Sequence, residues 1–317
     1  MTRRSQPRAR LVGLCSSFAL GLALLGSACT DSSGPDAGAK TADASADTKA
    51  GAAGEAEKNA LPAAEELLAA SVDALGGAAS FEAIRSYYVE SQMTVDGLGL
   101  HGTAQTWWAG GDFYVETDMP GVGLVRLGSQ GGKIWSDDPI NGMRMITGVE
   151  AEQAAWSTSR CLALDWRQYF KSAETTALVD GDGGRRLAEI TFRSPSDDDV
   201  VLRLDLETKM PVSQSFKQAN PLGAMPVTVT FDDFREVAGT KVAYKQFVDA
   251  SLTKMSSITN KFEVNGEVPV DKFAPPGPKT IRLPDEAAEA PEKLMGKPQP
   301  ADAAAPENGD AKGPAAK

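Results

Sequence analysis

The sequence has few of the residues on which most catalytic and metal sites depend. It contains one histidine, His101, and three cysteines, at positions 15, 29 and 161. A Ser-His-Asp triad or a histidine-based zinc site would have to use His101, and no motif for either chemistry surrounds it. Because only Cys161 lies in the body of the chain, a disulfide framework is excluded. We therefore expect no metal, no cofactor and no enzymatic activity.

Basic stretches and complete ligand-binding motifs are also scarce. The formal net charge is -11, and no basic run follows the first ten residues, so nucleic acid is excluded as a partner. The stretch DGDGG at 180–184 lacks the downstream glutamate of a calcium loop, and we expect it to form a turn, like SDDD at 196–199. The stretch GSQGG at 128–132 lacks the lysine and hydroxyl that end a phosphate-binding loop.

No apolar run is long enough to span a membrane as a helix, but the N-terminus has the features of an export signal. Four arginines precede residue 11, and the uncharged run from Leu11 to Leu25 is shorter than the ~20 residues that a spanning helix needs. Small residues follow at 26–28. This order predicts a secretory signal peptide that is removed from the mature protein.

The segment Leu25-Gly26-Ser27-Ala28-Cys29 resembles the lipobox of bacterial lipoproteins. The resemblance implies that Cys29 is acylated and becomes the first mature residue, and a triacylated cysteine supplies the more than one chain that stable anchoring needs. Thr30 follows instead of the aspartate that retains enterobacterial lipoproteins in the inner membrane, which favours the periplasmic face of the outer membrane. The alternative is an ordinary secretory signal in which Cys29 is incidental.

Composition divides the chain into four segments. Residues 1–28 are the predicted signal peptide, and residues 29–60 are the lipidated cysteine with a tether that has no aromatic and no branched aliphatic side chain. Residues 277–317 are rich in Ala and Pro. Neither flank can bury enough apolar surface to offset the entropy of ordering, so we expect both to be disordered. The folded domain is predicted to span residues 61–276.

The body of the chain predicts a mainly β, α+β fold. Apolar residues at helical spacing predict helices over 62–75 and 149–170, with a short turn at 80–84 that Ser80 caps. Most of the remainder alternates apolar and polar residues at about one strand per 8–12 residues, which is typical of an antiparallel sheet or barrel. One face of such a sheet is apolar, and the two longer helices are available to cover it.

Four segments carry a resemblance to a known family: ALGGAASFEAIRS (74–86), LDLETKMPV (204–212), FDDFREVAGTKVAY (231–244) and VNGEVPVDKFAPP (264–276). They resemble the outer-membrane lipoprotein-sorting family of LolA- and LolB-like domains. The resemblance covers roughly residues 61–276 and implies a curved antiparallel sheet, or incomplete β-barrel, with helices over its mouth. The third strand, GGDFYVETDMP, has no match to the arginine by which the soluble carrier of that family holds its lid.

The family resemblance implies a lipid-anchored cell-envelope protein that binds acyl chains or lipoproteins in an apolar half-barrel, in lipoprotein sorting to the outer membrane. The alternative is a module on the same fold that binds or senses another envelope protein and carries no lipid. Apolar positions of the predicted strands are candidates to line a ligand site: Val89, Met93, Val95, Trp108, Leu202 and Leu204.

The turn MPGVGL at 119–124 is a second candidate site. Its glycines and proline predict a surface turn, yet Met119, Val122 and Leu124 are apolar, and an exposed apolar tip usually has a partner. The matching loop of the membrane-bound receptor in the family touches lipid, which implies a contact with membrane or client here. The alternative is that Leu124 starts the next strand and Val122 is a single exposed residue. Elsewhere we expect His101 to be exposed and Cys161 to be a buried free thiol.

Overall fold

The computed structural model describes residues 61–277, except 221, 222 and 252. Contacts divide the chain into two compact units, Met1–Pro276 and Gly277–Lys317, and all described elements belong to the first. Its strands are β1 (Ser86–Val95), β2 (Leu100–Ala109), β3 (Asp112–Met119), β4 (Gly123–Gln130), β5 (Lys133–Asp138), β6 (Gly142–Ile146), β7 (Ser172–Asp180), β8 (Arg186–Arg193), β9 (Asp199–Asp205), β10 (Pro211–Asn220), β11 (Gly223–Val237), β12 (Thr240–Asp249) and β13 (Lys254–Val264). Its helices are α1 (Ala64–Ala74), α2 (Ala78–Glu82), α3 (Gly148–Ser157) and α4 (Leu162–Asp165), with the 3₁₀ turns η2 (Trp166–Gln168), η3 (Asp182–Gly184) and η4 (Val270–Phe273).

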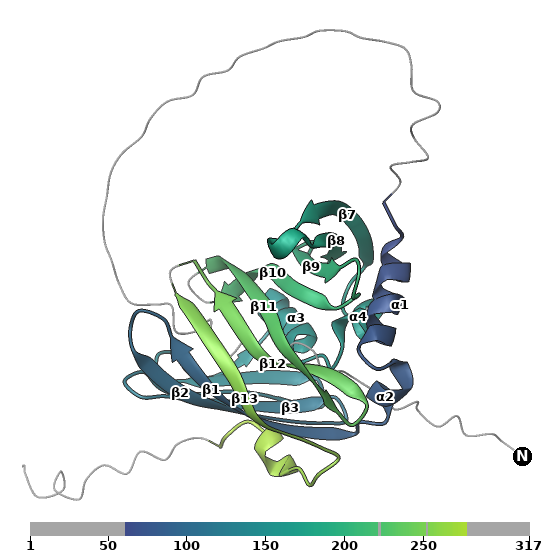
Figure 1. Cartoon of the computed structure of the whole chain (residues 1–317). Helices are drawn as coiled ribbons and strands as arrows, with labels where there is room; N and C mark the ends of the chain where they lie inside the picture. The colour runs from purple at the N-terminus through teal and green to yellow at the C-terminus, as the bar shows by residue number, and fades with distance from the viewer. Residues whose placement is uncertain (1–60, 221–222, 252, 278–317) are drawn as a thin grey trace, which may run out of the picture. The chain divides into compact units, whose positions relative to one another are not determined.

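The thirteen described strands form one antiparallel sheet in the order β6-β5-β4-β3-β2-β1-β13-β12-β11-β10-β9-β8-β7. Two meanders, β1–β6 and β7–β13, are therefore joined through the pairing of β1 with β13. The sheet curves around α3 and α4 without closing, because β6 and β7 form its two edges (Figure 1). This is the mainly β fold with covering helices, built as an incomplete barrel, that the sequence predicts, and the prediction is confirmed.

Alternation along the strands decides which face of the sheet is buried. In β9, Val200, Leu202 and Leu204 are buried in the core, while Val201 and Arg203 between them are partly exposed. Successive side chains of a strand point to opposite faces, so the apolar set of each strand shares the concave face. There it packs with buried residues of α1, α3 and α4 into one core. The helices thus cover the apolar face, as expected.

The prediction of one continuous helix over 149–170 is wrong, because the helix is interrupted. The segment breaks into α3, α4 and η2, and Cys161 between them is extended at φ -152° and ψ 99°. At the end of α3, the hydroxyls of Ser157 and Thr158 donate to the Ala154 carbonyl at 3.2 and 2.9 Å. Hydroxyl groups that bond the local backbone compete with helical hydrogen bonds and favour a break.

The predicted cap of the second helix is also wrong. Ser80 lies inside α2, and Gly77, at φ 84°, precedes the helix. A Cβ on Gly76 would lie 2.0 Å from the Gly239 carbonyl oxygen, so this turn packs directly on the β11–β12 turn. The Lys241 amide donates to the Leu75 carbonyl at 2.7 Å beside it. Tertiary contact with that turn, and not a side-chain cap, therefore sets the start of α2.

A short segment at the end of the domain covers part of the outer face of the sheet. Phe273 is buried against Tyr114 and Trp135, whose indole Nε1 donates to the Phe273 carbonyl at 2.8 Å. The Lys272 ammonium lies 4.0 Å from the ring centre of Trp107. Figure 1 shows this segment, coloured yellow-green, on the side of the sheet opposite the helices. We call residues 268–273 the outer strap.

Candidate functional site

The predicted ligand-lining residues lie together on the concave face, but that face is largely filled. All six are buried in the main core: Val89, Met93, Val95, Trp108, Leu202 and Leu204. The Trp108 ring stacks on Tyr87 with ring centres 5.6 Å apart. Leu202 alone among the six lines the apolar pocket described next, and Met93 reaches a shallow hollow at the ends of β1–β3. A role for these residues in ligand binding remains a prediction.

An apolar pocket remains between α1, α4 and strands β9–β12. Leu75, Leu162, Leu202, Phe231 and Phe234 form most of its apolar wall. Its free space is about 410 Å³ if the part open to solvent is counted, but the centre of a water molecule reaches only about 20 Å³ of it. A volume of that size holds about one water molecule. The interior under α1 is therefore close to packed.

A much wider opening, which we call the open groove, lies between the α3–η2 segment and the inner face of β3–β5. Phe113, Ile134 and Ala155 give it apolar surface. Ser129, Thr158, Gln168, Tyr169 and Arg167 add polar groups around them. The centre of a water molecule reaches about 720 Å³ of the groove, a volume within the usual range of small-molecule sites. No carboxylate is among its lining residues, although the chain is acidic.

The segment 158–169 separates the open groove from the apolar pocket, and it holds a buried arginine that the sequence analysis did not single out. Arg160 is 1% exposed, and its Nη1 donates to the carbonyls of Phe81 and Ile84 at 2.7 and 3.3 Å. Its guanidinium lies 5.4 Å from the ring centre of Trp108. Arg160 thus ties the helical cover to the end of α2. The signal available in the sequence was an arginine directly before the apolar run CLAL at 161–164.

Asp165 is the acidic neighbour of this arginine. It is 7% exposed, and burial raises its pKa to about 6, although the positive charge of Arg160 opposes the shift. Its Oδ1 accepts a hydrogen bond from Gln168 at 3.1 Å, whereas its Oδ2 has no partner among the described residues. Burial likewise lowers the pKa of Arg160. Both charges therefore carry a desolvation cost that their mutual attraction offsets only in part.

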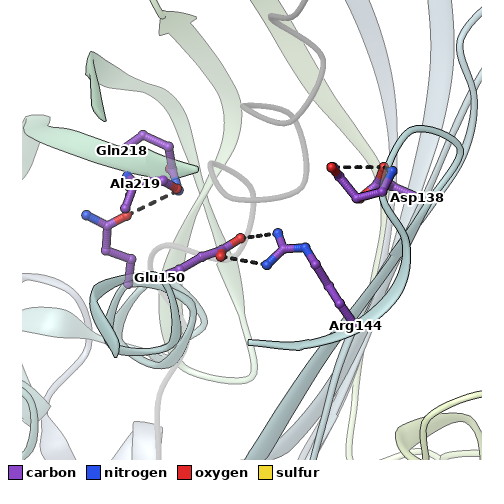
Figure 2. A network of polar contacts seen from close by, with 7 residues as sticks. Asp138, Arg144, Glu150, Gln218 and Ala219 are labelled. Carbon is purple, nitrogen blue, oxygen red and sulfur yellow. Dashed lines mark hydrogen bonds and ion pairs between the residues drawn. The ribbon is translucent and has the colours of Figure 1, made fainter. Parts of the chain in front are cut away.

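Helix α3 connects two distant parts of the sheet. Arg144, on edge strand β6, forms a two-pronged ion pair with Glu150, and one of its hydrogen bonds measures 2.7 Å. On the other side of α3, Gln153 donates to the Lys217 carbonyl at 2.6 Å and accepts from the Ala219 amide at 2.8 Å. Figure 2 shows Glu150 directed toward Arg144 and away from Gln218 and Ala219. The helix therefore fastens β6 to β10 across the concave side.

The turn at 119–124 is less exposed than the sequence suggests. Met119 is fully buried, which corrects its placement at a surface tip. Val122 is half-buried against the core, and Leu124 is half-buried within β4. The Val122 amide donates to the Met119 carbonyl at 2.9 Å and closes the turn. A contact of Val122 and Leu124 with lipid or a client remains a prediction.

The remaining candidates lie where expected. His101 is exposed, and its Nδ1 lies 3.1 Å from the Thr94 hydroxyl. Cys161 is a buried free thiol. No three His, Cys, Asp or Glu side chains among the described residues are placed to hold a metal ion, and no described helix combines the length and apolarity needed to cross a membrane. Cys29 lies outside the described residues, as do the predicted signal peptide, tether and tail.

Comparison with known proteins gives structural relatives only. No family model and no curated protein sequence matches the chain. Solved structures that are similar to the chain include a LolA superfamily protein, a lipoprotein-sorting protein domain and a DUF1329 family protein. A LolA superfamily protein from Nitrosomonas europaea is 12% identical with a TM-score of 0.47, over 68% of this chain and 98% of its own. These names agree with the family that the sequence segments resemble.

Two further neighbours are similar to the same extent. A lipoprotein-sorting protein domain from Vibrio parahaemolyticus is 12% identical with a TM-score of 0.46, over 66% of this chain and 97% of its own. A DUF1329 family protein from Desulfovibrio piger is 11% identical with a TM-score of 0.47, over 67% of this chain and 95% of its own.

Proposed function

We propose that this protein is a non-enzymatic, lipid-anchored protein of the cell envelope that binds the acyl chains of a lipid or lipoprotein, in lipoprotein sorting to the outer membrane. The open groove is the observation that carries the proposal. Phe113, Ile134 and Ala155 offer apolar contact along its inner side, and polar groups without a carboxylate surround them. Apolar contact stabilises an aliphatic chain by roughly 25 cal/mol per Å² removed from water.

The anchor and location form part of the same proposal. Cys29, acylated, holds the protein at the periplasmic face of the outer membrane, and residues 30–60 provide reach between membrane and domain. The lipobox-like segment before Cys29 and the threonine after it support this arrangement. A domain tethered in this way can receive a chain from a carrier without leaving the membrane.

The proposal is tested by lipid extraction from the purified full chain, followed by mass spectrometry. Wild-type protein should retain acyl-chain compounds. Ala155→Trp should reduce the retained amount at least about five-fold, because the indole occupies the groove. Ile258→Trp is the matched control, since Ile258 is exposed on the outer face of β13 and should retain them at the wild-type level. Absence of acyl compounds from the wild type, or their equal retention by Ala155→Trp, would count against the proposal.

A second candidate function has support from edge strand β6. Ile140, Met143 and Met145 are 63%, 47% and 47% exposed and lie together at the β5–β6 hairpin. Adjacent exposed apolar side chains at a sheet edge are typical of protein-interaction surfaces. In this alternative the protein binds another envelope protein and carries no lipid. The double variant Met143→Glu with Met145→Glu would then lose binding to that partner. Neither the wild type nor the double variant would retain lipid.

A further inference from the structure

The shallow hollow at the ends of β1–β3 opens on the convex face of the sheet, and we call it the polar hollow. The centre of a water molecule reaches about 340 Å³ of it, a volume within the usual range of small-molecule sites. Its hydrogen-bonding side chains come from three strands and are Gln92, Thr94, His101, Thr103 and Asp118. They share the convex face, because each alternates along its strand with core residues such as Met93, Ala104 and Met119.

The register of the strands brings these polar groups together. Thr94 is paired with His101. Thr103 is paired with Gln92 on one side and with Asp118 on the other. Side chains that are paired directly across an antiparallel sheet lie about 5 Å apart, so one small molecule can reach several of them. The Thr94 hydroxyl lies 3.1 Å from His101 Nδ1, and this contact leaves the imidazole Nε2 available to a ligand.

The chemistry of the lining restricts the ligand. Among the described residues that line the hollow, Asp118 is the only acidic one and none is a lysine or an arginine. An anion would therefore face a carboxylate with no cation to offset the repulsion. Hydroxyl groups suit the lining, because a hydroxyl donates to a carboxylate or amide oxygen and accepts from an amide or an imidazole. Met93 and Pro120 add apolar contact.

We propose that the polar hollow binds a neutral saccharide, whose hydroxyl groups donate to the Asp118 carboxylate and form hydrogen bonds with Thr103 and His101. A sugar ring combines adjacent hydroxyls with apolar C–H groups, and the hollow offers a contact for each. Hydrogen bonds to a carboxylate are stronger than those between neutral groups, so Asp118 supplies the main contact. The open groove lies on the inner face of β3–β5 and the hollow on the convex face, so the inference does not depend on the proposed acyl-chain function.

The test uses an array of neutral, acidic and amino-sugar oligosaccharides, to which the purified full chain is applied in a detergent without sugar head groups. The wild type should bind at least one neutral oligosaccharide, and it should bind neutral members more strongly than acidic or amino-sugar members. Titration calorimetry with the neutral oligosaccharide that gives the strongest signal then measures the affinity of the wild type and of each variant.

Two variants remove contacts in the hollow, and a third is the matched control. Asp118→Ala should weaken the affinity at least about ten-fold, because it removes a charged acceptor, and Thr103→Val about five-fold, because it removes one neutral hydroxyl. Both residues are exposed, and valine is favoured in strands, so the fold should be retained. Thr230→Val should leave the affinity unchanged. Thr230 is paired with the exposed Phe247 on the convex face and does not line the hollow.

Three results would overturn the inference. The first is that the wild type binds no neutral oligosaccharide of the array. The second is a preference of the wild type for acidic members, or for amino-sugar members, which would indicate a cation held by Asp118 alone. The third is wild-type affinity in Asp118→Ala or in Thr103→Val, which would place the saccharide outside the hollow. The first two results need no variant, so they remain decisive even if circular dichroism shows that a variant does not fold.

Discussion

At the scale of single residues, the buried charges of the segment between α3 and β7 connect stability to pH. Burial raises the pKa of Asp165 to about 6, above the ~3.9 expected in the unfolded chain. The folded state therefore binds a proton more tightly than the unfolded state. Stability from this carboxyl is fully present below about pH 4 and is lost as the pH rises through about 6.

We expect the free energy of unfolding of the wild type, relative to Asp165→Asn, to fall by roughly 1–3 kcal/mol between pH 4 and pH 7. Urea unfolding of both proteins at the two pH values measures this difference. Asp197→Asn is a control, because a hydrogen bond from Lys171 lowers the pKa of Asp197, so the stability from that carboxyl is already present above about pH 4 and should change little between pH 4 and pH 7. If the difference in free energy of unfolding between the wild type and Asp165→Asn were the same at both pH values, the raised pKa of Asp165 would be contradicted.

At the scale of elements, the outer strap is a short segment held by a small aromatic cluster. Tyr114, Trp135 and Phe273 form this cluster on the convex face. The Trp135 ring lies over Gly128 of β4, where a Cβ would come within 2.4 Å of the indole. Because Gly128 has no side chain, Trp135 can lie flat on the sheet and contact the outer strap.

We expect Phe273→Ala to reduce the free energy of unfolding by about 3 kcal/mol, because it removes a buried aromatic ring from the cluster. The indole hydrogen of Trp135 should also exchange faster with solvent, since it is bonded to the Phe273 carbonyl. Val270→Ala, at an exposed strap position, should cost less than about 0.5 kcal/mol. Urea unfolding and hydrogen exchange provide the two measurements. Equal effects of the two substitutions would show that the strap is not anchored through Phe273.

At the scale of the whole molecule, the proposed attachment to the membrane depends on one residue, Cys29. We expect Cys29→Ala to release the protein from the membrane fraction into the soluble fraction, because acylation supplies the proposed anchor. Cys15→Ala should leave the distribution unchanged, since Cys15 lies within the predicted signal peptide. Fractionation of cells followed by a salt wash gives the measurement. Membrane association of Cys29→Ala after the wash would show that another feature holds the protein there.

The sequence by itself determined the features that depend on local pattern. The alternation of Val200, Leu202 and Leu204 with Val201, Arg203 and Asp205 predicts a strand with one buried face, and glycine-containing pairs predict the turns between strands. The sum of these signals predicts an antiparallel sheet or barrel with helical covers. Such signals are local, because a strand's period and a turn's backbone conformation depend on neighbouring residues.

Only the tertiary structure decided which apolar residues face free space and which face each other. Val89, Trp108 and Phe113 carry the same alternating pattern and are all buried in the core, yet of these three only Phe113 borders the open groove. The burial of Arg160 also depends on partners more than 70 positions away, Phe81 and Ile84. Packing between distant segments sets the position of every hollow, and no local pattern contains that information.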